Sequence, residues 1–162
     1  MRLTKFTDYC LRVLMYVAVQ PVGARVTVPQ IASAFGISRT HLTKVVHHLG
    51  ATGVLRNVRG RGGGFELARP AAEVNIGAVV RGADSDVALV ECFDPRTNRC
   101  VITPVCRLRG ALETAIDAFY AALDRYTLAD ITGNREPLVE LMLGRHPRRS
   151  SPVRLRTVER AP

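Results

Sequence analysis

Apolar residues at helical spacing begin almost at the first residue of the chain. Within residues 4–20 they share one helical face, at Phe6, Cys10, Val13, Leu14 and Val17. Asp8 lies about 200° around such a helix from Phe6, so it points away from the apolar face. A proline and a glycine at positions 21 and 23 end the segment. The pattern predicts a helix that buries one face, with Cys10 in the core and Asp8 outside it.

Two shorter helical segments follow, separated by a turn of three residues. The first begins with a capping-box pattern at Thr27 and Gln30, has a proline in its first turn, and extends to position 35. Residues 36–38, Gly-Ile-Ser, form the turn, and Ser38 is expected to cap the second helix. The inner face of that helix holds Leu42, Val45, Val46 and Leu49. Two short helices joined by a glycine-containing turn are typical of a helix-turn-helix.

A glycine-rich, cationic segment separates two predicted strands. The strands cover residues 53–58 and 65–68, and the segment between them reads Arg59-Gly-Arg61-Gly-Gly-Gly. A helix-turn-helix followed directly by a basic hairpin is the layout of a winged helix, whose wing arginines reach phosphates or the minor groove. The alternatives are a plain glycine-rich turn and a nucleotide-binding loop. The nucleotide loop is disfavoured because neither of its glycine spacings occurs and no long helix follows directly.

The second half of the chain combines an irregular segment with one long helix. Asn75 is expected to cap a short helix that ends near position 82, and residues 83–106 have no regular period. A helix over about 107–125 follows. Its apolar residues are spaced three and four apart, at Leu108, Leu112, Ile116, Phe119, Leu123 and Tyr126. This spacing suits a helix that packs lengthwise on another helix, as in a dimer, and it suits an ordinary amphipathic core helix about equally well.

These elements predict a mainly α fold with a small β-hairpin wing. We expect a winged helix-turn-helix DNA-binding domain over residues 1–82, a cysteine-bearing loop over 83–106, a dimerisation helix over 107–133 and a basic, disordered tail over 134–162. No apolar run approaches the roughly 18–20 residues that a membrane span needs. Because nothing resembles an export signal either, we expect a cytoplasmic protein with no membrane partner.

The net charge of +9 indicates the class of partner. Residues 1–70 carry ten Lys and Arg against two Asp and Glu, and residues 134–162 carry seven against three, whereas residues 71–133 carry six against nine. Only Lys5 and Lys44 are lysines, and arginine suits bidentate recognition of phosphate and guanine. Double-stranded DNA bound by the N-terminal segment is therefore the leading hypothesis.

Residues outside the apolar face of the second short helix are candidates for contacting the major groove. Arg39 and Lys44 have the chemistry to read guanine, and the threonines can contact a thymine methyl or a phosphate. His41, His47 and His48 are expected to contact phosphate or solvent rather than a metal, because this helix offers no carboxylates. The predicted DNA-contacting set, including the wing, is Ser38, Arg39, Thr40, Thr43, Lys44, Arg59 and Arg61.

Three of the four cysteines, Cys92, Cys100 and Cys106, lie in the irregular, mildly acidic segment. Such a segment makes a poor core for structural cysteines, and it lacks the C-x2–4-C pairs of a zinc site. A thiol–disulfide sensor remains open. An iron–sulfur cluster is the other candidate, because a body with several irons accepts ligands from loosely spaced loop positions.

Four segments together resemble a known family. They are Met-Arg-Leu-Thr-Lys-Phe-Thr-Asp-Tyr at the start, Ser-Arg-Thr-His-Leu-Thr-Lys-Val-Val at 38–46, Val-Arg-Gly-Arg-Gly-Gly-Gly at 58–64 and Cys-Val-Ile-Thr-Pro-Val-Cys-Arg-Leu at 100–108. Over about residues 1–133 the chain resembles the winged-helix iron–sulfur transcriptional regulators that include IscR and NsrR. The segment 100–108 is most similar to the nitric-oxide-sensing repressors of that family.

The resemblance implies a homodimer with one iron–sulfur cluster per subunit, held by Cys92, Cys100, Cys106 and an aspartate of the partner subunit at the position of Asp8. Cys10 is the alternative fourth ligand. A 4Fe–4S cluster is favoured and 2Fe–2S is the alternative. The implied function is repression from a palindromic operator, released by nitric oxide. Two other hypotheses are a regulator that senses iron–sulfur status or redox poise, and an electron-transfer protein. The last is disfavoured because no flavin, nicotinamide or substrate motif occurs, so we expect no enzyme activity.

Overall fold

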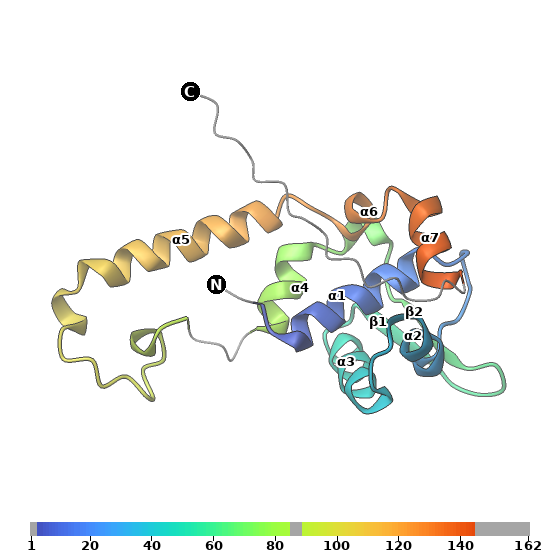
Figure 1. Cartoon of the computed structure of the whole chain (residues 1–162), viewed down its shortest axis with the longest axis horizontal. Helices are drawn as coiled ribbons and strands as arrows, with labels where there is room; N and C mark the ends of the chain where they lie inside the picture. Colours follow the sequence, from blue (N-terminus) through green and yellow to red (C-terminus); the bar gives the residue numbers. More distant parts are fainter. Residues whose placement is uncertain (1–2, 85–88, 145–162) are drawn as a thin grey trace, which may run out of the picture.

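The computed structural model of the chain describes residues 3–84 and 89–144 (Figure 1). The described part is mainly helical and contains one two-stranded antiparallel sheet, which confirms the expected fold class. Its helices and strands are α1 (Lys5–Ala18), α2 (Val28–Phe35), α3 (Arg39–Ala51), β1 (Leu55–Val58), β2 (Gly64–Leu67), α4 (Ile76–Ala83), α5 (Arg107–Leu123), α6 (Leu128–Ile131) and α7 (Arg135–Leu143). Short 3-10 turns cover Ala71–Glu73, Glu91–Phe93 and Thr103–Val105.

The core lies where α1, α2, α3 and α4 meet the sheet. Thr4 caps α1 by accepting a hydrogen bond from the backbone N–H of Thr7 at 3.1 Å. The predicted face of α1 is buried at Cys10, Val13, Leu14 and Val17 and partly buried at Phe6, and Cys10 is fully enclosed. The left-handed backbone of Gly36, with φ of 64°, ends α2 and directs the chain into α3. The predicted helix-turn-helix is therefore confirmed.

Ser38 differs from the expectation in one respect. It occupies the N-cap position of α3, but its side chain makes no capping hydrogen bond. The residue is exposed instead. Its hydroxyl therefore does not contribute to the stability of α3 as a cap.

The wing follows α3 directly. Strands β1 and β2 pair from Leu55 with Leu67 to Val58 with Gly64. Val26, in the turn before α2, extends this sheet by a bridge to Phe65, with two backbone N–O distances of 2.9 and 2.8 Å. A Cβ atom at Gly64 would lie 2.5 Å from the carbonyl oxygen of Val26, so only glycine allows the two backbones to approach this closely.

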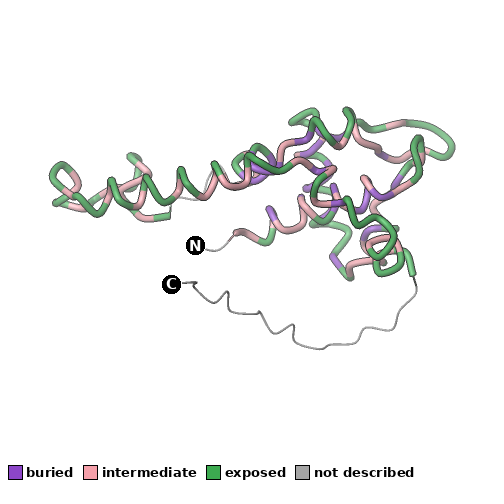
Figure 2. Tube along the Cα trace, turned by 90° about the horizontal axis from the view of Figure 1, so that it is seen from above, coloured by how far each residue is buried: buried purple, intermediate pink, exposed green. Residues whose placement is uncertain are grey.

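Helix α5 projects from the body of the molecule, with the cysteine-bearing loop at its far end (Figure 1). None of its residues is buried, and Figure 2 shows the projecting part in the colours of exposed and intermediate residues. Only the C-terminal end of α5 packs against the core, through Phe119, Tyr120 and Leu123. The apolar face predicted for α5 is thus in two parts. Its C-terminal part packs against the body of the subunit, and its N-terminal part lies uncovered on the projecting arm.

The segments after α5 correct two of the expected boundaries. Residues 107–133 do not form one helix, because α5 ends at Leu123 and the chain returns to the body as α6. Leu128 of α6 is fully buried, and its N–H donates to the carbonyl oxygen of Val74 at 2.8 Å. The expected disordered tail, 134–162, begins with helix α7, whose Met142 packs partly buried against the core. Residues 145–162 lie outside the described part.

Across residues 3–84 and 89–144, no helix combines the length and the apolar character needed to cross a membrane.

Candidate functional site

Helix α3 presents a polar face beside its buried one. Leu42, Val45 and Leu49 are buried, which turns the opposite side of the helix outward. The predicted DNA-contacting residues of this segment are all exposed, at Ser38, Arg39, Thr40, Thr43 and Lys44. A recognition helix reads the major groove with residues placed in this way, near its N-terminal end.

Two of the three histidines of α3 contact α1. The ring of His48 lies edge-on to Phe6 with 5.3 Å between the ring centroids, and the ring of His41 lies 6.2 Å from that of Tyr9. Phe6 and Tyr9 belong to the first turns of α1, so this part of α1 packs along α3. The expectation that the histidines face only phosphate or solvent did not anticipate these contacts.

The wing places two cations at its exposed tip and a third beside it. Arg59 and Arg61 are exposed, as expected. Arg25, from the turn before α2, donates from Nη1 to the carbonyl oxygen of Gly62 at 3.2 Å and so supports the loop of the wing. Sequence reasoning missed Arg25, because 37 residues separate it from Gly62 and no local pattern connects them.

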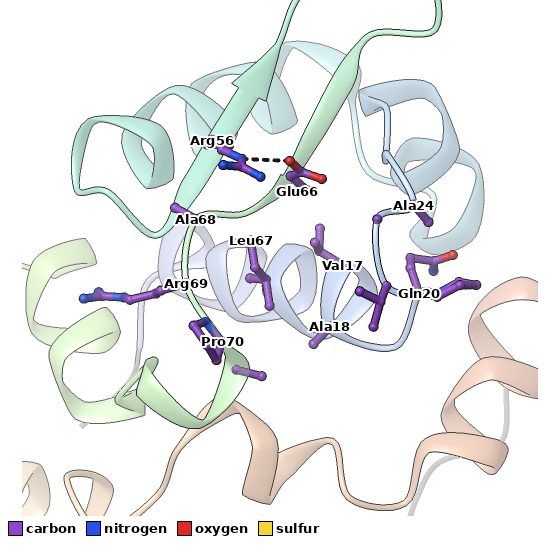
Figure 3. A pocket seen from close by; sticks show the side chains of 14 residues that line it. Val17, Ala18, Gln20, Ala24, Arg56, Glu66, Leu67, Ala68, Arg69 and Pro70 are labelled. Atoms are coloured by element: carbon purple, nitrogen blue, oxygen red, sulfur yellow. Dashed lines mark hydrogen bonds and ion pairs between the residues drawn. The ribbon is translucent and has the colours of Figure 1, made fainter.

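Behind the wing lies a hollow of about 540 Å³, between the end of α1, the turn after it and strand β2 (Figure 3). Its charged lining consists of Arg56, Glu66 and Arg69, and Arg56 donates to Glu66 at 2.7 Å. Among the lining residues there is no cysteine, histidine, serine or aspartate. The hollow therefore offers neither a nucleophile nor a proton-transfer group outside an ion pair.

The three loop cysteines are free thiols, and each is partly buried. Cys92 lies in the 3-10 turn Glu91–Phe93, and Cys106 is the N-cap residue of α5. Cys100 lies between them, where its N–H donates to the side-chain oxygen of Asn98 at 3.0 Å and its carbonyl accepts from Thr103 Oγ1 at 2.8 Å. The side chain of Glu91 accepts from the N–H of Arg99, which joins the first turn to the middle of the loop.

Within the described residues of one subunit, no three His, Cys, Asp or Glu side chains gather into a metal site. The chemistry of the donors nevertheless fits an iron–sulfur cluster, since all three are thiols held in no disulfide. Arg109 of α5 lies over the ring of Phe93 at 6.0 Å, which brings the turn with Cys92 towards the start of α5 near Cys106.

Asp8 and Cys10, the two candidates for the fourth ligand, lie in opposite environments. The side chain of Asp8 is 45% exposed, and Arg12 holds both of its oxygens, with Nε–Oδ1 and Nη2–Oδ2 distances of 2.9 Å. Cys10 is fully buried, and burial, reinforced by the charge of Asp84, raises the pKa of its thiol to about 12. Asp8 is thus an accessible anion, whereas Cys10 is a protonated core residue.

Comparisons with known proteins identify the family of the chain. Residues 3–134 match the Rrf2 family, described as an iron-dependent transcriptional regulator. The chain is 47% identical over 142 residues to the HTH-type transcriptional regulator NsrR of Geobacillus kaustophilus and 45% identical over 142 residues to that of Bacillus subtilis. Each of these alignments covers 88% of this chain and 97% of the relative.

Solved structures show the same fold at lower identity. The T. potens IscR structure superposes with a TM-score of 0.67 at 20% identity, covering 85% of this chain and 90% of that chain. The B. subtilis global cysteine regulator CymR superposes with a TM-score of 0.64 at 21% identity, covering 83% and 98%. With the family match and the relatives at 45% identity or more, these comparisons show that the chain belongs to the Rrf2 family of DNA-binding transcriptional regulators and is not an enzyme.

Proposed function

We propose that this protein is a homodimeric transcriptional repressor that binds a palindromic operator and leaves it when nitric oxide reacts at an iron–sulfur site. The observation that carries the proposal is the presence of three free, partly buried thiols on a projecting loop in a chain about 45% identical to regulators named NsrR. The conclusion thus combines a thiol donor set with a DNA-binding fold.

Operator binding is the task of α3 and the wing. The exposed N-terminal part of α3 enters the major groove, where Arg39 and Lys44 contact base edges and the threonines position the helix. Arg59 and Arg61 hold the flanking phosphates or the minor groove. A dimer presents two such units about one helical turn of DNA apart, which selects a palindromic operator.

The proposed cluster ligands are Cys92, Cys100 and Cys106 of one subunit with Asp8 of the partner subunit. Three thiolates and one carboxylate suit a 4Fe–4S cluster, and 2Fe–2S is the alternative. When bound, the cluster supplies iron atoms that nitric oxide attacks. The oxygen ligand would hold iron more weakly than the thiolates, which would leave that iron more open to attack.

The two ends of the ligand set lie on parts of the chain that govern DNA binding. Asp8 belongs to α1, whose Phe6 and Tyr9 contact the recognition helix. Cys106 begins α5, the arm proposed to join the two subunits. Loss of the thiolate and carboxylate bonds would therefore release α1 and the start of α5 together, and it would weaken the hold on both half-sites.

Anaerobic purification followed by a nitric oxide titration tests the proposal. The protein should carry iron and sulfide and show a charge-transfer spectrum, and a mobility shift on operator DNA should vanish as the spectrum changes. A colourless protein after full reconstitution would overturn the cluster. DNA binding that persists through complete reaction would overturn nitric oxide sensing and favour a sensor of iron–sulfur status.

The ligand assignment has its own test. Asp8→Ala should bleach the cluster spectrum faster in air, whereas Cys10→Ala should leave the spectrum unchanged, because Cys10 is enclosed in the core. If only the Cys10 variant loses the spectrum, Asp8 is not the ligand.

A further inference from the structure

The carboxylate of Asp84 holds the first turn of α1. Thr4 Oγ1 donates to Asp84 Oδ1 at 2.8 Å, and the hydroxyl of Thr7 donates to the same oxygen. Thr7 is fully buried, so its hydroxyl depends on a protein partner. A carboxylate at a helix N-terminus is also stabilised by the helix dipole. Asp84 is thus bound to α1 by hydrogen bonds and by charge.

Asp84 stands at the junction of two parts of the chain. Its backbone N–H donates to the carbonyl oxygen of Val80 at 3.0 Å and closes the last turn of α4. Eight residues later the chain reaches Cys92. Asp84, from which the chain continues to Cys92, is therefore attached to the N-terminal turn of α1.

The same turn of α1 carries the groups on which the proposed function depends. Asp8 follows Thr7 directly, and its N–H donates to the carbonyl oxygen of Thr4 at 3.1 Å. Phe6, the residue before Thr7, contacts His48 of the recognition helix. A shift of the Thr4–Thr7 turn therefore changes both the position of Asp8 and a contact to α3.

We propose that Asp84 is a positioning residue that couples the state of the cysteine-bearing loop to the recognition helix through Thr4 and Thr7. This inference rests on the proposed function. While the loop is held by its ligands, Asp84 keeps the N-terminal turn of α1 in the position that supports α3. When the loop is released, the displacement reaches α1 through the two hydroxyl hydrogen bonds. Without the Asp84 carboxylate, the recognition helix responds less to the state of the loop in its own subunit.

The test is the ratio of operator affinities between the cluster-loaded and the cluster-free full-length dimer. Coupling between sites typically changes an affinity by about 5-fold to 150-fold. Asp84→Ala should reduce this ratio at least fivefold. Asp84→Asn keeps an oxygen that accepts from both threonines and should retain most of the ratio. Glu73→Ala is the matched control, since Glu73 is an exposed carboxylate outside α1 and the cysteine-bearing loop and its removal should leave the ratio unchanged.

A purely structural role predicts a different pattern, because it would lower both affinities equally and leave the ratio as in the wild type. That outcome would overturn the role of Asp84 while the proposed function stands. If the wild type shows no cluster-dependent affinity, the proposed function itself fails. Should Asp84→Ala not fold, Thr7→Val, which removes one of the two donors, must lower the ratio by itself; an unchanged ratio would overturn the proposal.

Discussion

The guanidinium group of Arg81 binds both carboxylate oxygens of Asp124, with distances of 3.0 Å from Nη1 to Oδ2 and 2.6 Å from Nη2 to Oδ1. Arg81 lies on α4, and Asp124 is the C-cap residue that follows α5. Asn75 Nδ2 also donates to the carbonyl oxygen of Asp124, at 2.7 Å. The projecting arm is therefore fixed to the body at one joint. The geometry of this joint determines where α5 points.

The joint requires glycine at position 77. A Cβ atom there would lie 2.0 Å from Asp124 Oδ1. We expect Gly77→Ala to displace Asp124 and to lower the free energy of unfolding by about 1–3 kcal/mol, as overpacking does. It should also weaken operator binding, because a redirected α5 changes the half-site spacing. Urea unfolding and fluorescence anisotropy on operator DNA measure the two effects.

Gly82, on the same helix, is the matched control. No atom lies within 4 Å of a Cβ built there, so Gly82→Ala should be neutral or stabilising by up to about 1 kcal/mol through helix propensity. Equal stabilities for the two alanine variants would contradict the role of the joint.

The wing arginines should contribute affinity without sequence preference. Arg59→Ala combined with Arg61→Ala should weaken binding to all DNA sequences, because fewer phosphate charges are neutralised. The slope of log K against log salt should fall by about 0.9 for each phosphate that the variant no longer binds. Arg125→Ala is the control, since this exposed residue lies outside the wing. A salt titration with wild-type slope for the double variant would exclude the wing from the interface.

The sequence predicts elements well where their stabilising contacts are local. The capping residues of α1 and α2, the apolar faces of α1, α2 and α3, and the glycine-rich tip of the wing all lie within their own segments. The helix that begins at Ile76 follows the same rule, because Asn75 accepts from the N–H of Ala78 at 2.9 Å.

The features that the sequence does not predict depend on contacts between residues that lie far apart in the chain. Leu128 belongs to the core only because the chain turns back after α5 and bonds to Val74. Asp84 acquires its role from hydroxyls 77 and 80 positions earlier, and Arg25 acquires its role from the wing. The cysteines are visible in the sequence, but their spacing does not indicate the proposed fourth ligand, because a residue from another subunit has no fixed spacing to them.

Dimerisation should depend on the uncovered half of α5. Phe119 and Leu123 pack on their own subunit, which leaves Leu108, Leu112 and Ile116 for a partner. We expect Ile116→Glu to produce a monomer with sharply reduced affinity for a palindromic operator, because a carboxylate would be buried without a partner charge. Sedimentation velocity reports the oligomeric state.

The control for that experiment is Thr114→Glu. At about 100° per residue, Thr114 lies on the face of α5 opposite the three apolar residues, and it is exposed. This variant should remain a dimer. A dimeric Ile116→Glu protein would show that the subunits join elsewhere.

Cys10 should make the stability of the protein fall above pH 9. The pKa of its thiol is about 12 in the folded protein against an ordinary value of 9.0. Between these values the unfolded chain loses the proton and the folded chain keeps it, so rising pH favours unfolding by about 1.4 kcal/mol per pH unit. Urea unfolding of the reduced full chain at pH 8 and pH 10 should therefore show a larger loss for the wild type than for Cys10→Ala, by about 1.4 kcal/mol. The variant isolates this contribution because it differs from the wild type at no other position. If the stability of the wild type and of Cys10→Ala depends on pH in the same way, the Cys10 thiol ionises in the folded protein. Cys10 would then again be a candidate iron ligand.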